Sequence, residues 1–419
     1  MRKWKLLVFM FVWSSVALAQ QQITLQQCFD YAIINHPVFS QKSLKADMVN
    51  VEIENYKKDL YPQIALNAKA SYQNEVIGLN IDIPQLDIPE LSKDQYRLSL
   101  DVQQAIYRGG LYQKQKELAN LNQVLEQLDV DKNLYHIKKD VKDLFFAILL
   151  IDEQKEILKS LGNRLSSKAD ELKALMEEGV VLSSSLDGIK AEQLTLDIQM
   201  NELSIQRKVL MDNLQLLTHM DLSEVKELVV SPVYLEEQEQ KRLEIAYLTA
   251  FQTKLEYSKD LIDVQKLPQI SAFATGGYGR PGFNYLSDDF DDFYMVGLQL
   301  HWKILNWNKL NNKKKILDIN IAVIESQKEE LQLNIQMALA AMKAEIQKKE
   351  DILKNDPEMI RLRKSIAENA SNQLNLGSIT TSAYIDELQK QSQAEINMKI
   401  HRIQLINSKL DYLNALGKL

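Results

Sequence analysis

Two long stretches of the chain carry apolar residues at steps of mostly three, four and seven, and this pattern constrains the fold most. Such heptad spacing is typical of α-helices that pack in coiled-coil fashion. A helix that follows the first stretch to its end would run on the order of 100 Å, which is too long for a compact globule. The apolar positions are Leu118, Leu121, Leu125, Leu128, Leu134, Ile137, Val141, Leu144, Ile148, Ile151, Leu158, Leu161, Leu165, Leu172 and Leu175 in the first stretch, and Leu317, Ile321, Ile324, Leu331, Ile335, Met342, Ile346, Leu353 and Ile360 in the second.

Each long stretch leads to a glycine that is followed by hydroxyl side chains. Glycine commonly ends a helix, and Ser or Thr commonly caps the start of the next one. Shorter apolar repeats of helical spacing then follow, so the sequence predicts two long helical hairpins, at about 111–217 and 309–417. The turns between their helices are predicted at Gly179 with Ser183 and Ser184, and at Gly377 with Thr381 and Ser382.

Before each helical hairpin, apolar and polar side chains alternate with a period of two. Ile64 to Tyr72 and Tyr96 to Val102 alternate in this way, and Tyr294 to Ile304 does so in the second half. Period-two alternation is the pattern of a β-strand with one apolar and one polar face. The sequence therefore predicts strand hairpins at about 63–107 and 269–305. Their connections are rich in Pro, Gly, Asn and Asp and are predicted to be loops.

The order of elements occurs twice in the chain. The segment from Pro62 to Tyr72 returns as the segment from Pro268 to Tyr278, with Pro, Gln, Ile, one Ala and Tyr shared. A period of this length is far too long for a solenoid unit and indicates a duplicated half. We expect a first structural repeat at 20–219, a linker or equatorial subdomain at 220–240, and a second structural repeat at 241–419.

The first nineteen residues have the pattern of a secretory signal peptide. A basic start is followed by an apolar run and by Ala17-Leu18-Ala19, which resembles a cleavage site. We therefore expect residues 1–19 to be removed, and beyond them no apolar run is long enough for a membrane-spanning helix. Cys28, the one cysteine, is predicted to be a small buried apolar residue.

Composition and motifs exclude several classes of function. A net charge of −7 argues against a nucleic-acid partner, and one cysteine with five scattered histidines predicts neither a disulfide framework nor a metal site. The run Gly277-Tyr278-Gly279-Arg280-Pro281-Gly282 formally fits a nucleotide-binding pattern, but no helix is predicted after it, so it is predicted to be a flexible loop. Asp288 to Asp292 is predicted to be a solvated acidic loop. No catalytic set is apparent, so the chain is predicted to be neither an enzyme nor a cofactor-binding protein.

The alternating strands fit two settings. An ordinary sheet would bury the apolar face in protein, whereas an outer-membrane strand turns it toward lipid and carries aromatic residues near both ends. The helices after each strand pair extend beyond any globule and favour the membrane setting. Four strands cannot close a barrel, so several protomers must pool their strands. The candidate aromatic girdle is Tyr96, Tyr107, Tyr294, Trp302 and Trp307.

The chain resembles the TolC-like outer-membrane efflux channels. The residues that carry the resemblance are Ile23-Thr24-Leu25 with Ala32 and Asn35-His36-Pro37, Tyr61-Pro62, Leu267-Pro268, Ile106-Tyr107-Arg108-Gly109-Gly110, Gly179, Gly377 and Tyr412-Leu413-Asn414-Ala415-Leu416-Gly417. They occur in order over essentially the whole chain after the signal segment. The resemblance implies a homotrimer in the outer membrane of a Gram-negative bacterium, with four strands per protomer in a transmembrane β-barrel. It also implies an α-barrel tunnel through the periplasm, a periplasmic adaptor and an inner-membrane transporter of the RND or ABC type.

The resemblance also implies a gate at the periplasmic end. The family often carries acidic rings six and nine residues past the second turn glycine, which are Ala383 and Asp386 here. The candidate gate residues are therefore Asp386 and, at the matching position of the first half, Ser185. The second strand-to-helix junction departs from the family, because Leu305-Asn306-Trp307-Asn308-Lys309 replaces a glycine turn. Asn tolerates left-handed backbone, so the turn is expected to survive.

The predicted function is a passive, trimeric exit duct of a tripartite efflux or type I secretion system. An inner-membrane pump would supply the energy through the adaptor. The alternative is a periplasmic coiled-coil adaptor without a membrane barrel, which would have one helical hairpin with flanking β-domains. The fold class predicted for the exit duct is mixed α and β, mainly α.

Overall fold

The computed structural model describes residues 22–77, 91–223, 225, 227–235 and 242–419. The predicted signal peptide at 1–19 lies outside the described residues. The chain divides into two compact units. The sheet unit contains the described parts of 42–128 and 245–329, and the helical unit contains those of 22–41, 129–244 and 330–419.

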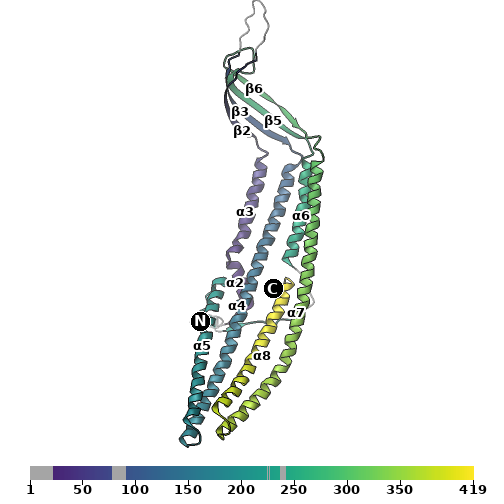
Figure 1. The fold of residues 1–419 in the computed structure, drawn as a ribbon. Helices are drawn as coiled ribbons and strands as arrows, with labels where there is room; N and C mark the ends of the chain where they lie inside the picture. The colour runs from purple at the N-terminus through teal and green to yellow at the C-terminus, as the bar shows by residue number, and fades with distance from the viewer. Residues whose placement is uncertain (1–21, 78–90, 224, 226, 236–241) are drawn as a thin grey trace, which may run out of the picture. The chain divides into compact units, whose positions relative to one another are not determined.

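Both predicted kinds of element are present, and helices predominate. The strands are β1 (Gln22–Thr24), β2 (Gln63–Tyr72), β3 (Asp94–Tyr107), β4 (Glu227–Val229), β5 (Gln269–Arg280) and β6 (Asp291–His301). The helices are α2 (Leu25–Asn35), α3 (Pro37–Lys58), α4 (Leu111–Glu177), α5 (Ser183–Thr218), α6 (Leu243–Val264), α7 (Lys309–Asn375) and α8 (Thr381–Ala415). A mainly helical fold with some strands is confirmed (Figure 1).

Four strands form one antiparallel sheet in the order β2-β3-β5-β6. The two predicted strand pairs are therefore joined side by side through β3 and β5, from Tyr96 opposite Arg280 to Tyr107 opposite Ile270. The register places the even-numbered residues of all four strands on one face up to Gln104 of β3, and the odd-numbered ones on the other. Strands β2 and β6 are the two edges of this sheet.

One prediction about the sheet was wrong. The stretch from Gly277 to Arg280 is not a flexible loop but the end of strand β5. Glycine is required there because a Cβ on Gly277 would lie 2.2 Å from the carbonyl oxygen of Leu98 and 2.6 Å from Cζ of Phe293. A glycine-rich run in a strand marks a close approach of neighbouring groups, and a sequence pattern cannot distinguish that from a loop.

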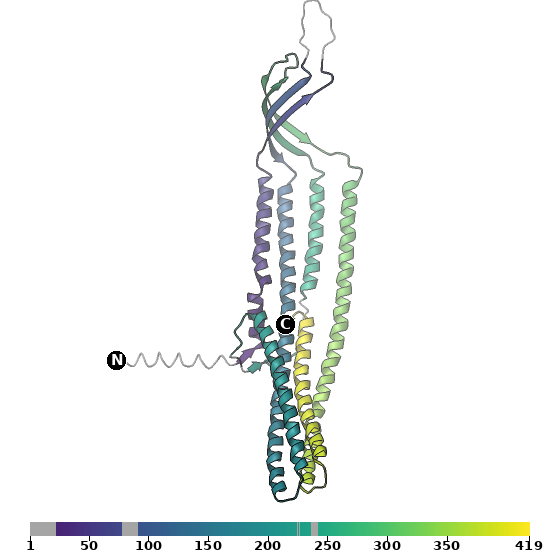
Figure 2. The ribbon, with the colours of Figure 1, turned by 60° about the vertical axis from the view of Figure 1, so that its left-hand side comes forward.

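Helices α4 and α7 follow the two predicted heptad stretches and each has 67 residues. The heptad residues Leu134, Val141, Leu165 and Leu172 of α4 are buried. Helix α7 continues through Pro357, where only one backbone hydrogen-bond donor is missing. Figure 2 shows how α5 returns along α4 and how α8 returns along α7, which makes two helical hairpins.

The two junctions between strand and long helix have the same backbone geometry. Gly109 and Gly110 have φ of 61° and 78°, and Trp307 and Asn308 have φ of 49° and 62°. The left-handed conformation costs glycine nothing, whereas it costs Trp307 roughly 1–2 kcal/mol. The predicted survival of the glycine-free turn is confirmed, with Lys309 N–H donating to the Asn306 carbonyl at 3.0 Å.

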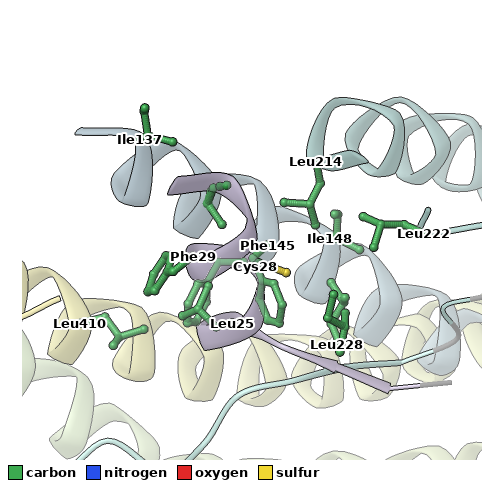
Figure 3. Packing of buried hydrophobic residues seen from close by; sticks show 14 of the residues in the cluster. Leu25, Cys28, Phe29, Ile137, Phe145, Ile148, Leu214, Leu222, Leu228 and Leu410 are labelled. Carbon is green, nitrogen blue, oxygen red and sulfur yellow. The ribbon is translucent and has the colours of Figure 1, made fainter. Parts of the chain in front are cut away.

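The core of the helical unit gathers around α2 (Figure 3). A capping box starts this helix, because Gln27 N–H donates to Thr24 Oγ1 and Thr24 N–H donates to Gln27 Oε1. Cys28 is fully buried against Phe145 and Ile148 of α4, as predicted. Burial raises the pKa of its thiol to about 12, so the group is neutral at physiological pH.

The segment predicted as a linker contains a strand that is tied to the start of the chain. Strand β4 pairs in parallel with β1, so that Leu228 lies opposite Ile23. Leu222 and Leu228 join the same core as Cys28. The described part of 220–235 is therefore packed onto the helical unit. Residues 236–240 of the predicted linker lie outside the described part of the chain.

Candidate functional site

The turns at the end of the two helical hairpins have the geometry that the sequence predicted for helix stops. Gly179 and Gly377 have φ of 74° and 67°. Each turn is a Schellman motif, because Val180 N–H donates to the Leu175 carbonyl at 2.8 Å and Ser378 N–H donates to the Gln373 carbonyl at 2.9 Å. The glycines therefore fix how sharply each hairpin turns.

In each hairpin the N-cap of the returning helix lies one residue before the hydroxyl residue that was predicted to cap it. Helix α5 begins at Ser183, and the capping position is Leu182, which has no side-chain cap. In the second hairpin the cap is Thr380, whose hydroxyl accepts from Ala383 N–H at 3.3 Å, and α8 begins at Thr381. The first turn is thus less well capped than the second.

Residues of the two turns line an open cavity of about 820 Å³. The candidate tip and gate residues come together in its lining, which includes Ser184, Ser185, Gly377, Thr381, Ser382 and Asp386. The remaining two candidates, Gly179 and Ser183, are not part of this lining. The candidate gate residue Asp386 forms an ion pair with Lys390 of the same helix at 2.5 Å. Its charge is therefore partly compensated within α8.

The two hairpins approach each other most closely where α5 meets the start of α8. A Cβ on Gly188 would lie 3.8 Å from Cβ of Thr381 and 3.4 Å from its methyl group. Nearby, Gln389 of α8 donates to Glu192 of α5 at 2.6 Å. The absence of a side chain at Gly188 lets the two helices touch at the tip.

A buried lysine that the sequence analysis missed links the hairpins above the cavity. Lys168 of α4 is 3% exposed. Its ammonium donates to Glu171 at 2.9 Å, to Ser371 Oγ at 2.8 Å and to Asn375 Oδ1 at 2.6 Å. It also lies 5.3 Å from the ring centre of Tyr384 in α8. One side chain of the first hairpin therefore holds both helices of the second.

A second polar link follows one helical turn away. Arg164 donates to Ser392 Oγ of α8 at 2.7 Å and forms an ion pair with Glu395 at 3.4 Å. Arg164 and Lys168 are four residues apart on α4 and therefore lie on one face of it. Lys168 itself occupies a heptad position between Leu165 and Leu172. A polar residue at such an apolar position is the sequence signal that could have identified Lys168 as a functional residue.

The two faces of the sheet differ in chemistry. The even-numbered face carries large apolar side chains that are mostly exposed, including Val296 at 72% and Leu298 at 75%. On the odd-numbered face, Asp101 accepts hydrogen bonds from Asn67 at 2.6 Å, Ser99 at 3.1 Å and Thr275 at 2.7 Å. An exposed apolar face of this extent marks a surface that meets lipid or another protein.

The candidate girdle residues lie toward both ends of this sheet. Tyr96 and Tyr294 lie toward the β5–β6 loop, and the Tyr96 ring stacks on Phe290 at 6.1 Å. Tyr107 ends β3, and Trp302 follows β6 and donates its indole N–H to the Lys266 carbonyl at 3.1 Å. Trp307 is among the most exposed side chains described.

Exposed apolar stripes on the helices were also missed by the sequence analysis. On α5 the exposed apolar residues form a heptad series separate from the buried residues of that helix. On α7 the exposed apolar residues lie in its first half. The residues are Leu194, Ile198, Ile205, Val209 and Leu216 on α5, and Ile316, Ile319, Val323, Leu333 and Met337 on α7. Exposed apolar residues at heptad spacing suit coiled-coil packing against a further helix.

Two features are absent from the described residues. None of the helices within the described ranges is long and apolar enough to cross a membrane. In the same part of the chain, no group of His, Cys, Asp and Glu side chains is placed to hold a metal ion.

Comparison with solved structures identifies the fold. The chain is similar to the CmeC outer membrane channel of Campylobacter jejuni, with a TM-score of 0.65, 15% identity and coverage of 94% of this chain and 85% of that one. It is similar to the outer membrane protein VceC of Vibrio cholerae, with a TM-score of 0.66, 12% identity and coverage of 94% and 96%. It is also similar to the MtrE outer membrane channel of Neisseria gonorrhoeae, with a TM-score of 0.63, 13% identity and coverage of 94% of this chain and 88% of that one. No protein-family model and no curated protein sequence matches the chain. The predicted TolC-like fold is confirmed.

Proposed function

We propose that this protein is a passive outer-membrane channel, formed by three copies of the chain, that serves as the exit duct of an efflux or secretion system. The observation that carries the proposal is a four-stranded sheet with one exposed apolar face and one polar face. Similarity to channel structures at 12–15% identity supports the fold, and the function rests on the chemistry of the faces.

The two faces of the sheet favour a location in the membrane, and its two edge strands favour an oligomer. Its apolar face suits the hydrocarbon region of a bilayer, and its polar face suits a water-filled lumen. Strands β2 and β6 would leave unpaired backbone groups in lipid, where each unsatisfied group costs several kcal/mol. Pairing β6 of one copy with β2 of the next removes these edges. Three copies then give a barrel of twelve strands with candidate girdle residues at both ends.

The exposed stripes on the helices support the same assembly. Apolar residues that repeat in heptads on α5 and α7 fit helices of a neighbouring copy, because coiled-coil packing buries such residues. The helices of three copies would then enclose a tunnel. The adaptor alternative expects a single helical hairpin, whereas this chain has two together with a four-stranded sheet.

The tips are the proposed gate and docking site. Ser184, Ser185 and Ser382 present small polar side chains at the end of the hairpins, where a periplasmic adaptor coupled to an RND or ABC type transporter would dock. Thr381, also predicted for docking, is buried. The Lys168 and Arg164 links hold the second hairpin against the first. Opening would require these links to break, with energy supplied by the partner pump.

The efflux proposal is tested in cells from which the gene for this chain has been deleted. We expect them to retain a fluorescent efflux dye and to expel it again when the chain is restored. Retention that is identical with and without the chain, across dyes of both charges and for secreted proteins, would contradict an exit duct.

Replacement of Lys168 by methionine is expected to loosen the tip. The side chain length is kept, but Ser371 and Asn375 lose their shared donor, at a cost of roughly 1–3 kcal/mol. We expect cells carrying Lys168→Met to become sensitive to large antibiotics that the outer membrane normally excludes. Lys173→Met is the matched control, because Lys173 is exposed on the same helix. Equal sensitivity of the two variants would contradict a role for Lys168 in closure.

A further inference from the structure

The polar face of the sheet carries two cations directly opposite each other. Lys69 of β2 pairs in register with Arg97 of β3, and both side chains are exposed. Like charges at a cross-strand pair destabilise a sheet. A sheet that keeps such a pair therefore holds a local concentration of positive charge that its own folding does not require.

Neither cation forms an ion pair with the carboxylates of the same face. Among the described residues, no ion pair or hydrogen bond reaches the side chain of Lys69 or Arg97. Asp101, two rows away, accepts its hydrogen bonds from Asn67, Ser99 and Thr275, which are all neutral. Asp291 occupies the same row as Arg97 but lies two strands away, beyond Gly279, at about 10 Å.

Arg97 is held in place by aromatic rings, which leave its charge intact. Its guanidinium lies 4.5 Å from the ring centre of Phe293 and 5.5 Å from that of Phe283, and the two rings contact each other at 4.7 Å. The Phe293 ring lies over β5 because Gly277 has no side chain there. Aromatic faces attract a cation without donating or accepting a hydrogen bond, so the N–H groups stay available.

One of the two rings is itself accessible. Phe293 is buried, whereas Phe283, from the loop between β5 and β6, is 41% exposed. That loop is anchored to the segment before β3, because Asp288 accepts hydrogen bonds from the backbone and side chain of Ser92. The prediction of a solvated acidic loop from Asp288 to Asp292 was therefore wrong in part, because Asp288 holds the loop to Ser92 and Asp291 and Asp292 begin strand β6. The result is an exposed apolar ring beside Arg97, which lies opposite Lys69, and neither cation forms an ion pair or a side-chain hydrogen bond within the described residues.

We propose that Lys69, Arg97 and Phe283 form a binding site for organic anions that carry an aromatic or other apolar group. The acidic group would bind the two cations, and the apolar part would contact Phe283. The inference rests on the proposed channel, in which the polar face lines the lumen. Rings of Arg and Lys side chains favour anions in pores, and a lumen with low-dielectric walls strengthens their field.

The test is current block in single channels of the full-length protein in planar bilayers. Every protein compared carries Lys168→Met, so that the proposed tip links do not hold the channel closed. The probes are naphthalene-1-sulfonate and its neutral analogue naphthalene-1-sulfonamide. We expect the sulfonate to block the current at concentrations at least tenfold lower than the sulfonamide does. In the double variant Lys69→Gln with Arg97→Gln, block by the sulfonate is expected to weaken at least tenfold, while Lys69→Arg retains it.

The outcomes distinguish a failure of the binding-site proposal from a failure of the channel proposal. Equal block by the two probes, or unchanged block in the double variant, would overturn the site while leaving the channel proposal intact. A protein that gives no current even with Lys168→Met would overturn both proposals. Where the double variant does not assemble, Lys69→Gln alone serves, with an expected weakening of about threefold, and unchanged block in it would equally overturn the site.

Discussion

Val296→Arg is expected to remove assembled protein from the outer membrane, whereas Met295→Arg is expected to leave it in place. The two residues are neighbours in the middle of β6 and lie on opposite faces of the sheet. An arginine that faces lipid at the midplane costs roughly 2–4 kcal/mol, and the proposed trimer would repeat this cost in each of its copies. An arginine on the polar face would lie in water.

The paired design distinguishes a lipid-facing sheet from a sheet in water. Both side chains are exposed, Val296 at 72% and Met295 at 47%, so in water both substitutions would change stability by only about 0.5 kcal/mol. The measurement is the amount of each variant in purified outer membranes and the temperature at which its oligomer dissociates. Equal behaviour of the two variants would contradict the assignment of the even-numbered face to lipid.

A disulfide between positions 188 and 381 is expected to stop transport completely. The Cβ separation of 3.8 Å between Gly188 and Thr381 matches the spacing of about 3.8 Å in natural disulfides. The bond would join α5 to the start of α8 and hold the tips in the arrangement described here. The native Cys28 does not interfere, because it is buried with its thiol neutral.

The measurement is dye efflux from cells carrying Gly188→Cys with Thr381→Cys, under oxidising conditions and after addition of a reductant. We expect no efflux when the bond is formed and recovery when it is reduced. Each single cysteine variant is the control for the substitution itself, and both should transport under either condition. Normal transport by the oxidised double variant would contradict a gate at the tips.

The parts of this fold that follow from periodicity could be predicted from the sequence. The heptad spacing of Leu165 and Leu172 in α4 and of Ile189 and Leu196 in α5 predicts the buried seams of the first hairpin. The alternation through β3 and β6 predicts which side chains share a face. Both follow because one repeating geometry places every residue of the element.

Other features depend on tertiary contacts that a pattern does not encode. No local signal says which partner a helix face meets, since the exposed stripe on α5, with Ile198 and Ile205, has the same heptad character as its buried seam. Lys168 is one polar residue in an apolar series, and its partners lie about 200 positions away in α7. The close approach over Gly277 likewise depends on Phe293 from another strand.

Three copies of this chain are proposed to form one channel in the outer membrane. The most direct measurement is an electrophoresis gel of detergent-extracted outer membranes, with unheated samples beside boiled ones. We predict an unheated band at three times the mass of the boiled chain, which collapses to the single-chain band on boiling. A chain recovered as a monomer in the periplasmic fraction would contradict the account.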